Sequence, residues 1–479
     1  MATPFRRPLH RFLSPLVALV AALAATGAVR QSGPATIAIR DVTVIPATGG
    51  LPAPHTTVLV RGDRIAAIGP SADTPVPPDA RVVDGAGKYL VPGFIELHAH
   101  VSKARASSLG LFVANGVTTL RDMGGDHEEL LRWRREIAQG TRLGPRMLVA
   151  GPYLEAARNV ERMRRDPPEA RIEPFERTRI PIGSPDEARR AVASLAGREL
   201  DFLKVRTVQD RETYRALIDA AHAHGLDLVG HVAGIPPEVV LEAGQDGIDH
   251  TFSPSLENMT RDERLAVWRR FAERGVPVVP TLVTLFETTF PPLKHLRALT
   301  DDREGLVDPR RMYVSRYLVL DWREQVQEAS DERRAAWRKL WDEVIRRDLR
   351  EMHQAGVDVL AGSDVAALNV FPGFSLHDEM ALFVSELGMT PAEALERATS
   401  RSARFLGIGD SVGTVERGNV ADLVLLDASP LDDIRNTRRI AAVILRGVLF
   451  DDERLASVLN DVASHPDREK DDWGRARPR

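Results

Sequence analysis

The 479-residue sequence contains no cysteine. This absence excludes disulfide bonds, thiolate metal ligands and a lipid anchor on an N-terminal cysteine. The formal net charge is only −4, and no basic patch indicates a nucleic-acid partner. There is neither an internal repeat nor a loop of the type that binds nucleotide phosphates. A hydrophobic content of 43% and a charged content of 28% are typical of a soluble globular protein.

The first 28 residues differ in composition from the rest of the chain. Three arginines within the first eleven residues precede the apolar run Leu16–Ala25, and small residues continue to Ala28. This order predicts a secretory signal peptide over residues 1–28, cleaved after Ala24 or Ala28. A retained membrane anchor is disfavoured, because the run is shorter than the ~20 residues that span a bilayer. We therefore expect an exported protein, periplasmic or secreted.

Short apolar runs alternate with helical patterns through the middle of the chain, which predicts parallel βα units. Eight such units predict an α/β fold with a distorted (β/α)8 TIM-type barrel over residues 91–410. β-rich segments at 35–90 and 411–455 are expected to pair into a small β-sandwich domain built from both termini. Residues 464–479 form a charged tail. The expected barrel strands are Leu90–Leu97, Val117–Arg121, Arg146–Ala150, Phe202–Val205, Leu226–Gly230, Gly247–Asp249, Val276–Pro280 and Val357–Ala361.

Helix starts are marked by three capping-box patterns, at Ser184, Thr260 and Thr390. The densely charged stretch Asp331–Glu351 predicts a long, solvated helix. It belongs to an insertion between the seventh and eighth strands.

Polar side chains follow several of these strands where the strands end. His98 and His100 are two residues apart, so on an extended segment both imidazoles face the same side. Because functional groups of a parallel barrel gather at the carboxyl ends of its strands, these side chains should converge. Each has an ordinary alternative, such as a hydrogen-bonded histidine, a snorkelling lysine or a helix-capping aspartate. Because all of them occur at strand ends, the sequence predicts a metal site. Its members are His98, His100, Lys204, His231, His250 and Asp364.

Four other histidines differ from these candidates in their sequence surroundings. His222 and His224 lie in a helical pattern, where a spacing of two turns the rings apart by about 200°. They are therefore interpreted as a solvated face. His127 and His377 are expected in loops after strands two and eight, where they are candidates for substrate contact.

The motifs around these residues resemble the amidohydrolase superfamily, in particular its imidazolonepropionase-related and Xaa-Pro dipeptidase-like members. The resemblance implies two divalent metal ions, usually zinc, with His98 and His100 on the first and His231 and His250 on the second. Lys204 would carry a CO2-derived carbamate that bridges both metals. Asp364 would bind the first metal and act as general base and acid for a metal-bridging hydroxide. The motifs are Val91-Pro92-Gly93-Phe94, His98-Ala99-His100, Asp201–Val205, Gly230-His231-Val232, Gly247–His250 and Ala361–Asp364.

Departures from the family pattern suggest the substrate. Gly234 stands where single-metal deaminase-like members have a glutamate, which argues against a deaminase or a true imidazolonepropionase. We therefore expect hydrolysis of an amide or peptide bond, in a dipeptide or an N-acyl amino acid. Arg206 faces the same way as Lys204 and is the candidate for a substrate carboxylate, with Tyr153 a weaker one. The insertion at Phe290–Arg346 and the small β domain are possible homo-oligomer surfaces.

Two other readings stay open at this point. A mononuclear cyclic amidase, similar to imidazolonepropionase, would leave Lys204 unmodified. A catalytically silent barrel would keep its metals as structure and bind a ligand or partner.

Overall fold

The computed structural model describes residues 36–165, 175–232, 234–250, 256 and 258–467. The expected signal peptide and most of the expected charged tail lie outside these ranges. Within them, no helix combines the length and the apolar character that a membrane crossing requires.

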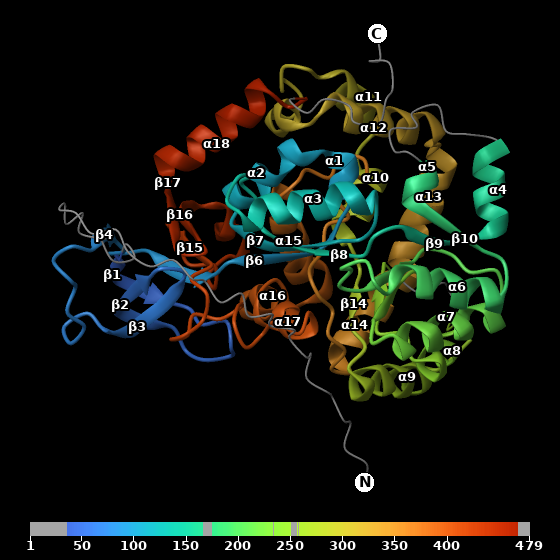
Figure 1. Cartoon of the computed structure of the whole chain (residues 1–479), viewed down its shortest axis with the longest axis horizontal. Helices are drawn as coiled ribbons and strands as arrows, with labels where there is room; N and C mark the ends of the chain where they lie inside the picture. The colour runs from blue at the N-terminus through green and yellow to red at the C-terminus, as the bar shows by residue number, and fades with distance from the viewer. Residues whose placement is uncertain (1–35, 166–174, 233, 251–255, 257, 468–479) are drawn as a thin grey trace, which may run out of the picture.

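A mixed eight-stranded sheet is built from both ends of the described chain, at the left of the view in Figure 1. β5 joins the two parts, because it pairs parallel with β1 and antiparallel with β15. Branched apolar side chains from both parts form one buried cluster on this sheet. The strand order is β17-β16-β15-β5-β1-β2-β3, with β4 beside β1. The bounds are β1 Thr36–Val44, β2 Ala53–Arg61, β3 Arg64–Pro70, β4 Arg81–Asp84, β5 Tyr89–Pro92, β15 Leu423–Leu426, β16 Ile440–Leu445 and β17 Val448–Asp451.

Two parallel sheets occupy the middle of the chain, surrounded by helices (Figure 1). One has the order β6-β7-β8 and the other β10-β9-β11-β12-β13-β14. Their strands are short and, apart from β8 and the outer strand β10, wholly buried, as expected of parallel sheets covered by helices. The bounds are β6 Phe94–Ala99, β7 Val117–Asp122, β8 Arg146–Val149, β9 Tyr153–Ala156, β10 Arg179–Ile182, β11 Leu203–Val205, β12 Leu228–Gly230, β13 Gly247–Asp249 and β14 Val278–Val279.

Helices follow most of these strands and supply the outer layer. Their bounds are α1 Val101–Ala104, α2 Leu109–Ala114, α3 His127–Ala138, α4 Ala157–Arg165, α5 Phe175–Thr178, α6 Pro185–Leu195, α7 Arg211–Ala223, α8 Pro237–Ala243, α9 Arg261–Arg274, α10 Leu282–Thr289, α11 Leu293–Asp301, α12 Arg316–Glu328, α13 Asp331–Leu340, α14 Arg346–Gln354, α15 Phe374–Leu387, α16 Pro391–Arg397, α17 Ser400–Phe405 and α18 Asp452–Ser464.

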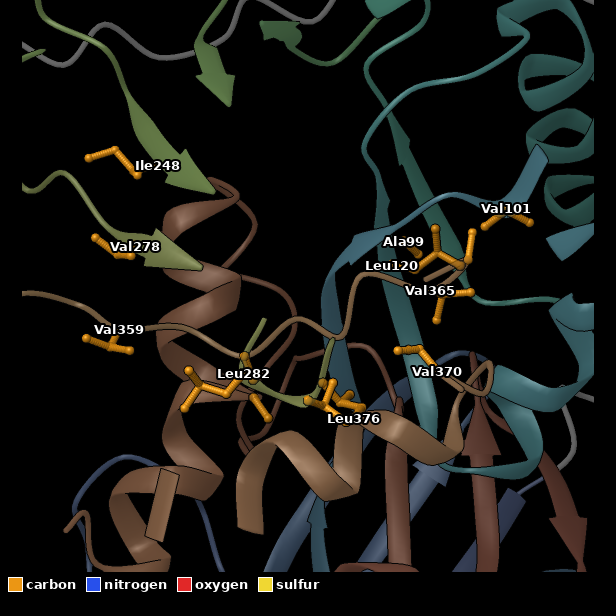
Figure 2. Close-up of a cluster of buried hydrophobic side chains, with 14 of the residues drawn as sticks. Ala99, Val101, Leu120, Ile248, Val278, Leu282, Val359, Val365, Val370 and Leu376 are labelled. Atoms are coloured by element: carbon orange, nitrogen blue, oxygen red, sulfur yellow. The ribbon is translucent and has the colours of Figure 1, made fainter. Parts of the chain in front are cut away.

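Segment 357–365 connects the two parallel sheets. Val359 forms a parallel bridge with Val278 of β14, and Val365 forms one with Ala99 of β6. The amide of Leu97 in β6 donates to the carbonyl of Ala361 at 3.2 Å. Figure 2 shows Ile248, Val278 and Val359 on neighbouring segments of one buried apolar cluster. The polar residues that follow these segments are thereby brought to one end of the sheets.

Several expected elements differ in detail. The expected strand Leu90–Leu97 is split between β5 and β6 at Gly93, where a side chain would meet Thr118 Oγ1 at 2.2 Å. The expected strand Val357–Ala361 is held by the bridges above without being a regular strand. β9 and β10 were not expected. The last residues of the expected β segment 411–455 begin α18 instead, capped by Asp451.

Helix starts agree better with the sequence. Thr260 and Thr390 form complete capping boxes with Glu263 and Glu393. Ser184 caps α6, but the side chain of Glu187 turns to the amide of Gly183. The expected long helix over Asp331–Glu351 is α13 and α14 joined by a π-helical turn at Trp341–Ile345. That turn is solvated only on one side, because Trp341, Val344 and Ile345 are buried while Asp342 and Glu343 are exposed.

Candidate metal centre

His98 and His100 lie at the end of β6, as the strand pattern predicts. His98 is in the strand and fully buried, while His100 is the first residue beyond it and precedes α1. Their ring centroids are 5.3 Å apart. Asp364 Oδ1 lies 3.4 Å from Nε2 of both rings. One carboxylate oxygen thus faces both imidazoles.

The backbone around Asp364 is held against β6. Its amide donates to the carbonyl of His98 at 2.8 Å, and its φ of 57° is in the left-handed region, which is uncommon for a residue other than glycine. A Cβ at Gly362 would approach the backbone nitrogen of His98 to 3.0 Å and its Cβ to 2.9 Å. Glycine therefore permits the close approach that brings the carboxylate to the histidines.

His231 and His250 extend the group along the ends of β12 and β13. Their ring centroids are 4.7 Å apart, and those of His98 and His250 are 4.9 Å apart. The amide of His231 donates to the carbonyl of Val205 at 3.0 Å. The preceding Gly230 has no room for a side chain, since a Cβ would lie 1.9 Å from that same carbonyl oxygen. His250 Nδ1 is 2.8 Å from Thr281 Oγ1, which fixes the ring.

Lys204 occupies the middle of β11 and is 1% exposed. Its ammonium forms an ion pair with Asp249. Burial lowers the pKa of Lys204, although the carboxylate of Asp249 opposes this shift. Asp249 also accepts from Arg121 Nη2 at 3.3 Å. Two cations therefore share one buried acid beside the histidines.

The donor set fits a divalent metal. Single ligand atoms of His98, His100 and Asp364 all lie within 4.8 Å of one another. Neither buried ring nitrogen of His98 makes a hydrogen bond, although a buried imidazole nitrogen normally does, and the carboxylate oxygens of Asp249 and Asp364 lie 3.4 Å from Nδ1 and Nε2. Burial lowers the pKa of His98 to about 3, which keeps the imidazole neutral as a metal ligand must be.

His100, Lys204, His231, His250 and Asp364 open onto one cavity, called here the polar cavity, with about 620 Å³ of empty space including its open mouth. The fully buried His98 is not among the residues that line it. Arg206 and Tyr153 stand on its wall, with the guanidinium carbon 5.7 Å from the ring centroid. The Tyr153 hydroxyl lies 3.0 Å from His100 Nδ1. The residues that line it are His100, Lys103, Tyr153, Lys204, Arg206, His231, His250, Asp321, Gln325, Asp364, Ala366 and Ala367.

The amidohydrolase family model matches residues 89–450, which is most of the chain. The chain belongs to the amidohydrolase family. The family predicted from the motifs is thus confirmed.

Named relatives point to several activities within this family. The chain is 43% identical over 91 residues to an adenine deaminase from Rubrobacter xylanophilus, covering 19% of this chain and 15% of the relative. It is 38% identical over 87 residues to an imidazolonepropionase from Thermoplasma volcanium, covering 18% and 21%. The chain thus spans about a fifth of the length of these curated relatives. A crystal structure of a candidate prolidase from Bifidobacterium longum is similar over 90% of this chain and 99% of that one, with 26% identity and a TM-score of 0.63.

Three of the expected site residues do not line the polar cavity of this amidohydrolase: His98, which is fully buried beside Asp364, and His127 and His377. His377 lies within α15 rather than in a loop, and its buried ring bonds Thr437 Oγ1 and the carbonyl of Asn115. His127 is the first residue of α3, and its Nε2 lies 3.2 Å from Arg198 Nη1. The expectation of loops was wrong because both sequences begin helices. His222 bonds Asp246 on the outside of α7, in keeping with a solvated face.

Three buried charged residues beside the ligands were not predicted from the sequence: Asp249, Arg121 and Glu96. Glu96 accepts from the amides of His98 and Ser363, each at 2.8 Å, and from the Ser363 hydroxyl at 2.6 Å. It therefore ties β6 to the residue before Asp364. Burial raises the pKa of Glu96 to about 7. The sequence did hold a signal for two of them, because each is an acidic residue in an otherwise apolar strand. Glu96 stands two positions before His98, and Asp249 stands one position before His250.

Proposed function

We propose that this protein is an exported, metal-dependent amidohydrolase that cleaves the amide or peptide C–N bond of a dipeptide or an N-acyl amino acid. The observation that carries the proposal is the grouping of His98, His100 and Asp364, of which His100 and Asp364 line one cavity with Lys204, His231 and His250. The ring nitrogens of His98 support it, because they make no hydrogen bond although carboxylate oxygens lie 3.4 Å away, and a metal ion would satisfy a buried imidazole nitrogen.

Two divalent ions, of which zinc is the first candidate, would be held by these side chains. His98, His100 and Asp364 would hold one, and His231 and His250 the other, with a Lys204 carbamate between them. Burial lowers the pKa of Lys204, which favours the neutral amine that reacts with CO2. Bound metals of this kind lower the pKa of water and polarise a carbonyl oxygen.

The protein side chains then divide the remaining work. The Asp364 carboxylate, whose pKa is held below its usual range by the neighbouring histidines despite burial, accepts a proton from water. It returns this proton to the departing nitrogen, as a general base that becomes a general acid. The Arg206 guanidinium, 40% exposed on the cavity wall, is placed to bind a substrate carboxylate.

The proposal also includes the closed barrel, the small β domain and the export that the sequence predicts. The two parallel sheets and segment 357–365 would form the closed (β/α)8 barrel, with the mixed sheet as its small β domain. Export would follow cleavage after Ala24 or Ala28. The mass of the mature protein, purified from an exporting host, tests this, since a retained N-terminus would contradict it.

A mononuclear hydrolase of a cyclic amide is the second candidate. The Lys204–Asp249 ion pair favours it, because a lysine held by an acid is less free to form a carbamate. The group His98, His100 and Asp364 would then hold a single ion. The imidazolonepropionase among the relatives also favours this reading.

Turnover of a substrate panel tests the proposal. The metal-loaded protein is assayed on dipeptides, N-acyl amino acids, cyclic amides and amino-purines. We expect hydrolysis confined to the first two classes and a loss of at least about 10²-fold in kcat for Asp364→Asn, because a general base contributes this much. The exposed Asp432→Asn is the matched control and should leave kcat unchanged. Turnover of Asp364→Asn at the wild-type rate, or activity on cyclic amides alone, would overturn it.

A further inference from the structure

A second cavity adjoins the proposed centre on the side of His250. It has about 710 Å³ of empty space including its open mouth, and His250 lines both this cavity and the polar cavity. We call it the apolar pocket. Its other lining residues come from the end of β14, from α10, from α13 and from the π-helical turn: Pro280, Thr281, Leu282, Thr284, Leu285, Thr288, Thr289, Trp337 and Ile345.

The walls of the apolar pocket offer hydrocarbon surface and no charge among the described residues that line it. Its threonine hydroxyls are largely engaged elsewhere. Thr281 Oγ1 bonds His250, Thr284 Oγ1 donates to the carbonyl of Ser363 at 2.9 Å, and Thr288 Oγ1 donates to the carbonyl of Thr284 at 2.7 Å. Threonines held in this way can present their methyl groups. The pocket therefore suits an uncharged, apolar group.

The helix that forms most of this wall is fixed at both of its ends. At its start, the buried Glu379 carboxylate accepts from the amides of Leu282 and Val283 at 3.0 and 2.7 Å. At its end, Arg334 and Arg338 of α13 donate to the carbonyl of Thr289 at 3.0 and 2.8 Å. The arginines thus satisfy free helix carbonyls. The pocket is consequently preformed, and little ordering is needed on binding.

Trp337 stands at the rim of the apolar pocket. Its side chain is 45% exposed, which is unusual for tryptophan in a folded chain, whereas four other tryptophans are fully buried. An exposed indole beside an apolar cavity can cover a ligand with its ring face. The ring would contribute more to binding than to the stability of the fold.

We propose that the apolar pocket binds a branched aliphatic or aromatic group on the acyl side of the scissile bond. This inference rests on the proposed function. The candidate carboxylate-binding Arg206 stands in the polar cavity, and a free carboxylate belongs to the amine side of a dipeptide or N-acyl amino acid. Because His250 lines both cavities, the acyl substituent of a carbonyl bound beside it would be directed to the apolar pocket.

The test compares three N-acyl alanines that differ only in the acyl group: acetyl, 3-phenylpropanoyl and succinyl. For the metal-loaded wild type we expect kcat/KM for 3-phenylpropanoyl to exceed that for acetyl at least about tenfold, since apolar pockets discriminate by such factors. Succinyl, with a terminal carboxylate, should be the poorest substrate. Equal kcat/KM for the three substrates would overturn the inference while leaving the proposed function intact.

Two pocket variants sharpen the comparison. Trp337→Ala should lower the phenylpropanoyl-to-acetyl ratio roughly three- to tenfold, as loss of an aromatic contact does. Leu285→Lys, on the half-buried face of α10, should lower the same ratio and raise kcat/KM for succinyl. Met312→Ala is the matched control, because Met312 is 40% exposed and lines a different groove. A control variant that shifts the ratio as much as Trp337→Ala would contradict the assignment.

A binding measurement separates failure of this inference from failure of the proposed function. If neither the acyl alanines nor the dipeptides of the substrate panel are hydrolysed, the proposed function fails. Calorimetry with 3-phenylpropanoate and acetate on the same metal-loaded protein then tests the pocket alone. We expect the aromatic acid to bind at least about tenfold more tightly, with the difference reduced in Trp337→Ala. Equal affinities would overturn the inference.

Discussion

The Asp249 carboxylate provides a prediction that does not depend on any bound metal. Asp249 is 1% exposed and accepts from the Lys204 ammonium through one oxygen and from Arg121 Nη2 at 3.3 Å through the other. Asp249→Asn keeps the shape but removes the charge. Arg121, itself 2% exposed, then remains buried without its ionic partner.

The expected cost follows from these contacts. At 3.3 Å and an effective dielectric constant of ~20, a charge pair gains about 5 kcal/mol before desolvation. Breaking a buried pair by removing one partner costs roughly 3 to 5 kcal/mol, because the other charge stays uncompensated. Asp249→Asn should therefore lower the free energy of unfolding by that amount. The double variant Asp249→Asn/Lys204→Met should recover part of the loss, since it removes one stranded cation.

Urea unfolding in the presence of a chelator measures this effect. The signal is the fluorescence of the buried tryptophans Trp133, Trp268, Trp322 and Trp341, and midpoints are compared at a shared slope. The exposed control Asp432→Asn should stay within about 0.5 kcal/mol of wild type. An Asp249→Asn variant within about 1 kcal/mol of wild type would refute the reasoning, since Asp249 would then not hold the two cations.

Two further predictions concern pH and substrate charge. Burial raises the pKa of Glu287 from 4.5 to about 7, so the folded protein binds a proton there more tightly than the unfolded chain between those values. The free energy of unfolding should therefore fall, by up to about 3 kcal/mol, as pH rises from 5 to 8. In urea titrations at the two pH values, Glu287→Gln should not show this part of the fall. An equal fall in wild type and variant would contradict the prediction. Arg206→Met should raise KM for an N-acyl amino acid about tenfold or more while changing KM for the matching C-terminal amide little. An equal effect on acid and amide would place the carboxylate elsewhere.

The metal-ligand candidates were predictable because each lies within or just after a short apolar strand, and such strands have a local sequence pattern. Alternation along β6 gave His98 and His100 a common side, and the structure brings them to one oxygen of Asp364. The capping boxes at Thr260 and Thr390 were likewise local, since a side chain and an amide three residues away decide them.

Features that depend on distant contacts were not predictable in this way. Asp249 and Lys204 are 45 residues apart, and only the pairing of β11, β12 and β13 brings them together. His377 was expected in a loop, but it lies within α15, and its ring contacts the carbonyl of Asn115 and the hydroxyl of Thr437. The apolar pocket is assembled from α10, α13 and a π-helical turn, so no single stretch of sequence contains it.

Metal content per chain tests the central claim of a lysine-bridged centre most directly. The wild type, Lys204→Ala and the control Lys88→Ala are purified with zinc and bicarbonate, and the bound metal is counted by elemental analysis. We expect about two metals per chain in the wild type and in the control, as two-metal hydrolytic sites hold, with a sharp fall in Lys204→Ala. One metal per chain, unchanged in Lys204→Ala, would contradict the bridging role of Lys204 and favour the mononuclear hydrolase.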